Sequence, residues 1–198
     1  MKFKVYNFKF NSKRKLPVVT VHGRFQPPLH INHWNYVSPA FDLADKVTIL
    51  ITNPNLDESD VKETNHRNKK ENNPFTYEQR VKIFQKFFEA MRIPAKRYEF
   101  KPFKITSDAD WDKILSKAVP NLVNTYGPWS RAKLEKFKVL GYKVIHSDKH
   151  KIIDVSGKNI RKILSRLLPQ AELKKKLVKA GYMKEAIDGL FKVLKKKR

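Results

Sequence analysis

The chain has 198 residues, 40% of them hydrophobic, so it is long enough to bury one core and favours a single domain with appendages. It contains no cysteine, which excludes disulfides and cysteine-ligated zinc or iron–sulfur sites. Lysine and arginine number 43 against 19 aspartates and glutamates, a formal net charge of +24. Three explanations of this excess stay open: association with nucleic acid, attraction of a polyanionic small substrate, or the charge style of the source organism.

Nothing in the sequence indicates a membrane or a secretory route. No apolar run approaches the roughly 18 residues of a membrane span. Residues 1–10 alternate lysine or asparagine with apolar residues and lack the continuous apolar stretch of a signal peptide. We therefore expect a soluble, cytoplasmic protein whose residues 1–16 form an N-terminal extension beginning with a short strand.

Strands and helices alternate along most of the chain. The patterns predict strands at 17–22, 46–51, 98–103, 122–125 and 142–146, and helices from about 32, at 77–91, at 111–118 and at 130–140. Pro39 falls inside the first helix and should kink or restart it. Residues 53–73 are polar with almost no apolar anchor and are predicted to form a long mobile loop. Thr76 and Gln79 fit a capping box at the start of the second helix.

This alternation predicts the α/β class. We expect a Rossmann-like parallel sheet of about five strands flanked by helices, with ligands bound beyond the carboxyl ends of the strands. Residues 1–168 would form this domain, and residues 169–198 a basic helical segment that packs on it or trails from it. Residues 172–198 hold ten Lys or Arg and three Asp or Glu. That composition is typical of a solvated amphipathic helix, and it is also the likelier contact if the protein binds nucleic acid.

The most informative segment runs from Gly23 to His33, where the first strand ends and the first helix begins. A glycine at this turn lets backbone N–H groups approach a phosphate, and the helix N-terminus adds donors and a partial positive charge. His30 and His33 are three residues apart, so on a helix they share one face and can reach one polyphosphate. Arg24 adds a bidentate donor. Alone, the His-x-x-His pair could equally be a metal half-site or two surface histidines.

The segment Gly23-Arg24-Phe25-Gln26-Pro27 before the two histidines resembles the signature of the nucleotidyltransferase superfamily defined by a His-x-Gly-His motif. Two further segments are similar to elements of its archaeal-type nicotinamide-nucleotide adenylyltransferases. Asn73-Pro74-Phe75-Thr76 with Arg80 looks like their Asn-Pro-Phe-Thr…Arg element. Residues 156–161, Ser-Gly-Lys-Asn-Ile-Arg, look like their Ser-Gly-Thr-x-Ile-Arg element, although alone they could be an ordinary helix cap. The resemblance covers residues 17–168.

The resemblance implies transfer of AMP from ATP to nicotinamide mononucleotide, forming NAD and pyrophosphate, with Mg²⁺ bridging the nucleotide phosphates and no metal ligand from the chain. It places His30 near the β- and γ-phosphates, His33 near the α-phosphate and Arg161 on the leaving pyrophosphate. The implied catalytic residues are Arg24, His30, His33 and Arg161. The implied nucleotide-binding residues are Gly23, Arg24, Phe25, His30, Asn32, His33, Ser156, Gly157 and Arg161. The implied acceptor-binding residues are Asn73, Arg80 and Trp111, the last of which could instead be a core tryptophan.

The sequence also departs from this pattern. Asn32 stands where the motif has glycine, Lys158 where it has threonine, Asn72 where an arginine is common, and Asp108 where an amide is expected. These changes keep two alternatives open. One is adenylyl or cytidylyl transfer to another phosphorylated acceptor, and the other is a nucleic-acid-binding protein on a retired enzyme scaffold. Relatives form hexamers or trimers, so a homo-oligomer is possible by analogy.

Overall fold

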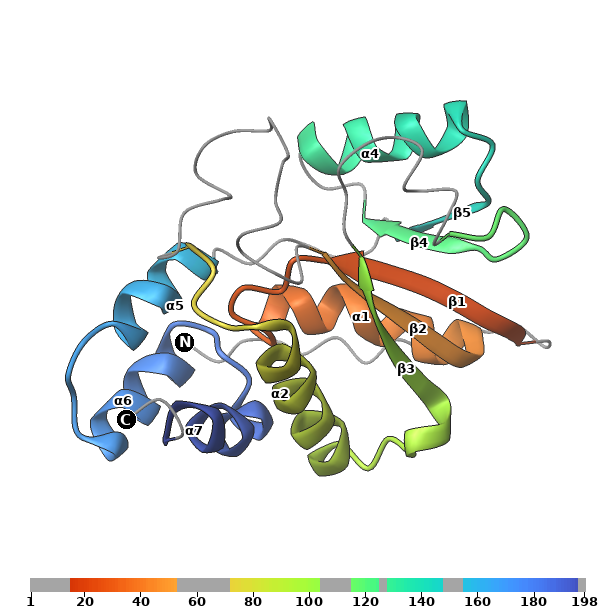
Figure 1. Cartoon of the computed structure of the whole chain (residues 1–198). Coiled ribbons are helices and arrows are strands. Elements are labelled where there is room, and N and C mark those ends of the chain that lie inside the picture. The colour runs from red at the N-terminus through yellow and green to blue at the C-terminus, as the bar shows by residue number, and fades with distance from the viewer. Residues whose placement is uncertain (1–14, 53–71, 104–114, 125–127, 148–154, 196–198) are drawn as a thin grey trace.

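The computed structural model describes residues 15–52, 72–103, 115–124, 128–147 and 155–195 (Figure 1). One sheet of five parallel strands lies at its centre, in the order β3-β2-β1-β4-β5. The strands are β1 (Leu16–Gly23), β2 (Ala44–Thr52), β3 (Tyr98–Phe103), β4 (Asn121–Asn124) and β5 (Val144–Ser147). Each lies within two residues of its predicted bounds. The predicted fold class, a parallel α/β sheet flanked by helices, is confirmed.

The strand order decides where a ligand would bind. β1 is the middle strand; it pairs with β2 along its whole length, from Leu16 opposite Ala44 to Gly23 opposite Ile51, and with β4 on its other side. The chain therefore builds the sheet from β1 through β2 to β3, and then crosses to the other side of β1 to add β4 and β5. Such a reversal makes the carboxyl end of β1 the switch point of the sheet, the usual ligand position in open α/β folds.

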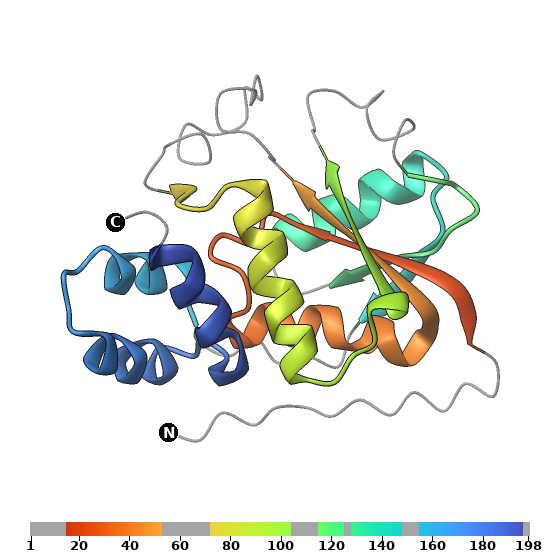
Figure 2. The same ribbon diagram turned by 60° about the horizontal axis from the view of Figure 1, so that its bottom comes forward.

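Helices cover both faces of the sheet, as Figures 1 and 2 show. Val19 and Val21 of β1 face the main core, to which α1 (Ile31–Leu43) and α2 (Tyr77–Ala90) contribute their apolar sides. On the other face, Leu50 and Val123 pack into a second, smaller cluster with residues of α4 (Pro128–Val139). The alternation of side chains along each strand, with a period of two, supplies both faces at once.

Local sequence signals explain how α1 and α2 begin and continue. α2 opens with the predicted capping box, in which the Gln79 amide N–H donates to Thr76 Oγ1 at 3.3 Å and the Thr76 N–H donates to Gln79 Oε1 at 3.0 Å. α1 runs unbroken through Pro39, so the predicted restart is wrong. Pro39 is buried, and packing of this helix on the core offsets the hydrogen bond that proline cannot make.

The last third of the chain adds α5 (Gly157–Leu164), α6 (Gln170–Lys179), the 3-10 turn η3 (Lys184–Ala186) and α7 (Ile187–Lys195). α7 lies against α2, and its residues Ile187, Leu190, Phe191 and Val193 belong to the main core. Gly189 permits this approach, because a Cβ there would lie 2.8 Å from the Lys86 Cβ. The basic residues of α6 and α7 face outward, whereas their buried apolar residues, which include Leu173 and Leu177 of α6, join the main core.

The prediction of a helix at 111–118 is wrong for its described part. Residues 116–119 form a turn, in which the Val119 N–H donates to the Ser116 carbonyl at 3.2 Å, and Leu115 before it is buried in the smaller cluster. Pro120 follows at once and disfavours helix in the residue before it. The strand predicted within residues 1–10, the loop at 53–71, Asp108 and Trp111 lie outside the described residues. Within the described part of the chain, no helix is long and apolar enough to cross a membrane.

Candidate functional site

The turn between β1 and α1 is held in an unusual backbone conformation. Phe25 has φ 49° and Leu29 has φ 63°, values in the left-handed region that cost a non-glycine residue about 1–2 kcal/mol. Both side chains are buried in the main core, and this burial holds them in place. Gln26 joins the turn to the segment just before α2: its Nε2 donates to the Phe75 carbonyl at 2.6 Å, and the Phe75 N–H donates to its Oε1 at 3.3 Å.

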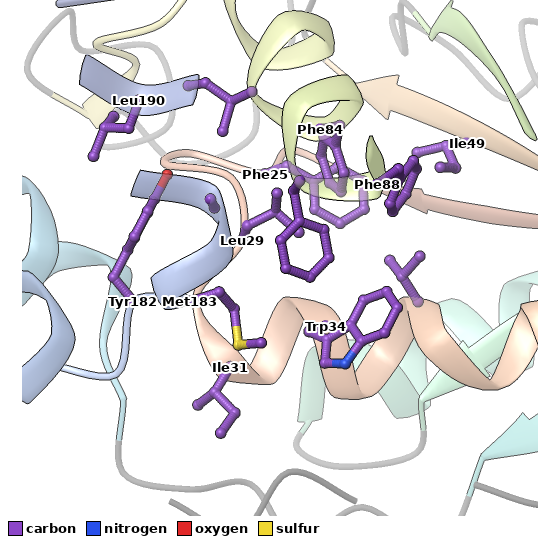
Figure 3. Close-up of a cluster of buried hydrophobic side chains, with 14 of the residues drawn as sticks. Phe25, Leu29, Ile31, Trp34, Ile49, Phe84, Phe88, Tyr182, Met183 and Leu190 are labelled. Atoms are coloured by element: carbon purple, nitrogen blue, oxygen red, sulfur yellow. The ribbon is translucent and has the colours of Figure 1, made fainter. Parts of the chain in front are cut away.

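The buried side chain of Phe25 packs against His33 from the core side. The ring of Phe25 fills the space beside Gly23, where a Cβ would lie 3.0 Å from the ring's Cζ. The ring meets His33 edge-on at a centroid distance of 5.1 Å and meets Phe84 of α2 at the same distance. The Phe25 side chain is buried and packs against the His33 ring, which it supports, and a contact of this residue with the nucleotide stays a prediction. Figure 3 shows Phe25 among the aromatic side chains of this core.

His30 and His33 come together at the start of α1. Their rings are stacked, with centroids 3.6 Å apart and planes inclined by 25°. Burial lowers the pKa of His30 to about 4, and the positive charge of Arg161 acts in the same direction. Burial, His30 and Arg24 together lower the pKa of His33 well below its usual value. Both rings are therefore neutral at pH 7, and an approaching polyanion would raise both pKa values and favour their protonation.

The start of α5 faces this histidine pair. A Cβ on Gly157 would lie 3.3 Å from the Gln26 carbonyl oxygen, 3.5 Å from Arg161 Nη1 and 3.8 Å from His30 Nε2, so glycine keeps this approach open. The Arg161 Nη1 donates to the Gln26 carbonyl at 2.7 Å, and its Nη2 donates to Asn72 Oδ1 at 3.1 Å. Arg161, a residue of α5, thus connects this helix to the β1–α1 turn and to Asn72 in the segment before α2.

Ser156 and Asn32 lie at the same junction. Ser156 is the exposed N-cap residue of α5 and makes no side-chain capping bond to its backbone. Asn32, in the first turn of α1, donates from Nδ2 to the Val155 carbonyl at 3.4 Å. The two helix N-termini therefore meet with Arg24 and Arg161 nearby, which is an arrangement suited to a phosphate-rich anion.

Two of the three residues expected to bind the acceptor, Asn73 and Arg80, have buried side chains. Arg80 is 0% exposed, and its guanidinium donates to three backbone carbonyls: from Nη1 to Arg24 at 2.7 Å and to Thr52 at 2.9 Å, and from Nε to Thr76 at 3.2 Å. Burial and the nearby Arg24 lower its pKa to about 10. The Arg80 side chain thus supports the turn through these three bonds, and its contact with an acceptor stays a prediction. Asn73 is buried, and Trp111 lies outside the described residues.

Sequence reasoning missed Gln26 and Tyr36 as parts of the site's frame. The Tyr36 hydroxyl donates to the Leu122 carbonyl at 2.9 Å and accepts from the His22 N–H at 3.2 Å, so it joins α1 to β1 and β4. Both residues pair with backbone groups far along the chain. The only signal in the sequence was a polar side chain in an apolar stretch, and that pattern does not predict which backbone group the side chain will bond.

The donor groups at this junction are imidazole, guanidinium and amide. Among the described residues, no group of three His, Asp or Glu side chains could hold a metal ion. Mg²⁺ prefers oxygen ligands in octahedral geometry, so these side chains do not fit a protein-held magnesium cage.

The chain is similar to known nucleotidyltransferases in sequence and in fold. No family model matches the chain. The phosphonoformate cytidylyltransferase of Streptomyces viridochromogenes is 25% identical over 154 residues, which cover 77% of this chain and 83% of that protein. The bifunctional NMN adenylyltransferase/ADP ribose pyrophosphatase of Francisella tularensis, solved with AMP and a manganese ion, matches with a TM-score of 0.53 and 17% identity over 86% of this chain.

The present chain spans only about half (51%) of the length of that Francisella structure. The nicotinic acid mononucleotide adenylyltransferase of Plasmodium falciparum, solved with NaAD, gives a TM-score of 0.49 and 13% identity over 88% of this chain and 94% of its own. The match with the Francisella structure shows that the fold is one found in nucleotidyltransferases. The cytidylyltransferase relative supports an enzyme of that class.

Proposed function

We propose that this protein transfers a nucleotidyl group from a nucleoside triphosphate to a phosphorylated acceptor. The observation that carries the proposal is the convergence of the stacked, neutral pair His30 and His33 with Arg161 at the switch point of the sheet. Two helix N-termini meet there, and the net charge of +24 favours attraction of a polyanionic substrate.

In the proposed reaction an acceptor phosphate oxygen attacks the α-phosphorus of the triphosphate in line. The new P–O bond forms as the bond between the α-phosphorus and the bridging oxygen breaks, and pyrophosphate leaves with that electron pair. An ionised phosphate, with its second pKa of about 6, needs no strong general base. Catalysis then rests on positioning and on stabilising the charge that develops.

Each residue of the junction has a proposed part in this reaction. His33 would contact the α-phosphate, His30 the β- and γ-phosphates, and Arg161 the leaving pyrophosphate, with Arg24, Ser156 and Gly157 around them. When a triphosphate binds, its charge raises the pKa of both histidines, so the rings become stronger donors. Mg²⁺ is proposed as an ion that arrives with the nucleotide phosphates.

For the substrate pair, we propose ATP with nicotinamide mononucleotide first, on the segments that resemble nicotinamide-nucleotide adenylyltransferases. A second pair, CTP with a phosphorylated or phosphonate acceptor, is favoured by the cytidylyltransferase relative. It is favoured also by Asn32, whose side chain occupies the position of the motif's glycine and is bonded to the Val155 carbonyl. Cytoplasmic localisation remains part of this proposal.

The test is pyrophosphate release from ATP or CTP, each with Mg²⁺ and with nicotinamide mononucleotide or phosphonoformate, together with mass detection of the product. NAD would support the first pair, and a CMP conjugate the second. The variant His33→Ala is the control for contaminating activity. Absence of pyrophosphate release from all pairs, with RNA or DNA binding that weakens steeply with salt, would favour the nucleic-acid-binding alternative and contradict the proposal.

A further inference from the structure

The turn between α6 and η3 lies directly against the turn that carries His30. The Ile31 N–H donates to the Gly181 carbonyl at 2.9 Å, and the Met183 N–H donates to the Leu29 carbonyl at 3.0 Å. Between these two bonds, His30 and Tyr182 form an isolated antiparallel bridge. His30 has no side-chain capping bond, so this backbone pairing fixes the start of α1. Figure 3 shows Tyr182 and Met183 beside Leu29 and Ile31.

Gly181 has a structural reason to be glycine. It follows the end of α6 with φ +85°, its N–H donates to the Val178 carbonyl at 3.0 Å, and the Tyr182 N–H donates to the Leu177 carbonyl at 2.9 Å. These two bonds are those of a Schellman motif, in which a left-handed glycine ends the helix.

Gly181 also has a second reason, which concerns the site. A Cβ at this position would lie 2.5 Å from the Val155 Cγ2 and 3.1 Å from its Cγ1, so Val155 packs directly on the Gly181 backbone. Val155 is the last residue before the N-cap of α5, and its carbonyl accepts the bond from Asn32. Gly157, two residues later, lies opposite His30 Nε2. Gly181 therefore touches both sides of the junction: the His30 turn through the backbone, and the start of α5 through Val155.

We propose that Gly181 is a positioning residue, which sets the spacing between His30 and the start of α5; its catalytic consequence rests on the function proposed above. A side chain at this position has to displace Val155, and with it either the start of α5 or the His30 turn. Groups that act on one triphosphate lose effect when they move by about 1 Å, a shift that costs on the order of 100-fold in rate.

The chain contains a matched control. Gly141 ends α4 with φ +77°, with the same two bonds, from the Gly141 N–H to the Lys138 carbonyl at 3.0 Å and from the Tyr142 N–H to the Phe137 carbonyl at 2.9 Å. A tyrosine follows in both motifs. A Cβ at Gly141 would meet nothing within 4 Å. Gly141→Ala therefore imposes the same backbone cost as Gly181→Ala without the steric contact.

The experiment compares Gly141→Ala, Gly181→Ala and the double variant Gly181→Ala with Val155→Ala, in the full chain. We expect similar losses of stability from the two backbone changes, because both place alanine in the left-handed region. Only Gly181→Ala should lower kcat, by about tenfold to 100-fold. The double variant should recover most of that loss, because the nearest remaining Val155 atom, its Cβ, would lie 3.4 Å away.

NMR signals of the His30 and His33 rings, recorded without nucleotide, separate this proposal from the proposed function. They should shift in Gly181→Ala, stay in place in Gly141→Ala and return in the double variant, whether or not the wild-type chain transfers nucleotides. Unchanged signals and kcat in Gly181→Ala, or an equal change in Gly141→Ala, would overturn the proposal. If Gly181→Ala does not fold, Gly181→Asn and Gly141→Asn replace the alanine pair, since asparagine tolerates the left-handed region.

Discussion

Replacement of Arg80 tests whether this arginine supports the turn or contacts the acceptor. Arg80→Ala removes three hydrogen bonds to backbone carbonyls, a buried one to Thr52 and part-buried ones to Arg24 and Thr76. The Thr76 carbonyl keeps the backbone N–H of residue 80 as a donor. Hydrogen bonds to a charged group contribute about 1.5–3 kcal/mol each, and bonds that share one side chain do not add fully. We expect the free energy of unfolding to fall by about 4–6 kcal/mol. Arg80→Lys keeps the charge and can reach fewer carbonyls, so it should lose roughly half as much.

Urea denaturation of both variants measures these losses, and Lys82→Ala is the control, since it removes a positive charge from the same helix at a partly exposed position. That control should change the free energy of unfolding by less than about 0.5 kcal/mol. A loss below about 1 kcal/mol in Arg80→Ala, together with a raised KM for the acceptor, would refute the supporting role and restore the acceptor contact.

Removing the ring in His33→Ala should lower turnover by about 100-fold or more while cooperative unfolding is retained; steady-state kinetics and circular dichroism check this, and unchanged turnover would contradict the proposed site. Acid should destabilise the protein, because an unfolded histidine with a pKa near 6.5 binds a proton that folded His30, with a pKa of about 4, does not. The unfolded state therefore binds more protons between these values, and we expect about 2 kcal/mol less stability at pH 5 than at pH 7, measured by urea denaturation. A free energy of unfolding that is the same at pH 5 and pH 7 would contradict the burial of an uncharged His30 ring. Arg92→Gly should stabilise the chain by about 0.5–1 kcal/mol, because Arg92 ends α2 with φ 56°; a lower melting temperature would count against this.

The sequence by itself determined the order of elements and the place of the site. Period-two and period-3.6 patterns are local, so the five strands, the capping box at Thr76 and the turn after Gly23 could be recognised without the fold. Parallel strands bring their carboxyl ends to one edge, and this rule predicted a ligand position after Gly23, whereas only the family resemblance implied that the segment at Ser156 belongs to the same site.

Only the tertiary structure decided what each side chain does there. Arg80 and Phe25 belong to motif segments, yet burial turns both into supports, because their contacts are to groups that fold next to them from other elements. The stacking of His30 on His33 and their lowered pKa values depend on the same burial. The α6–η3 turn reaches His30 from about 150 residues further along the chain, through backbone bonds that no side-chain pattern encodes.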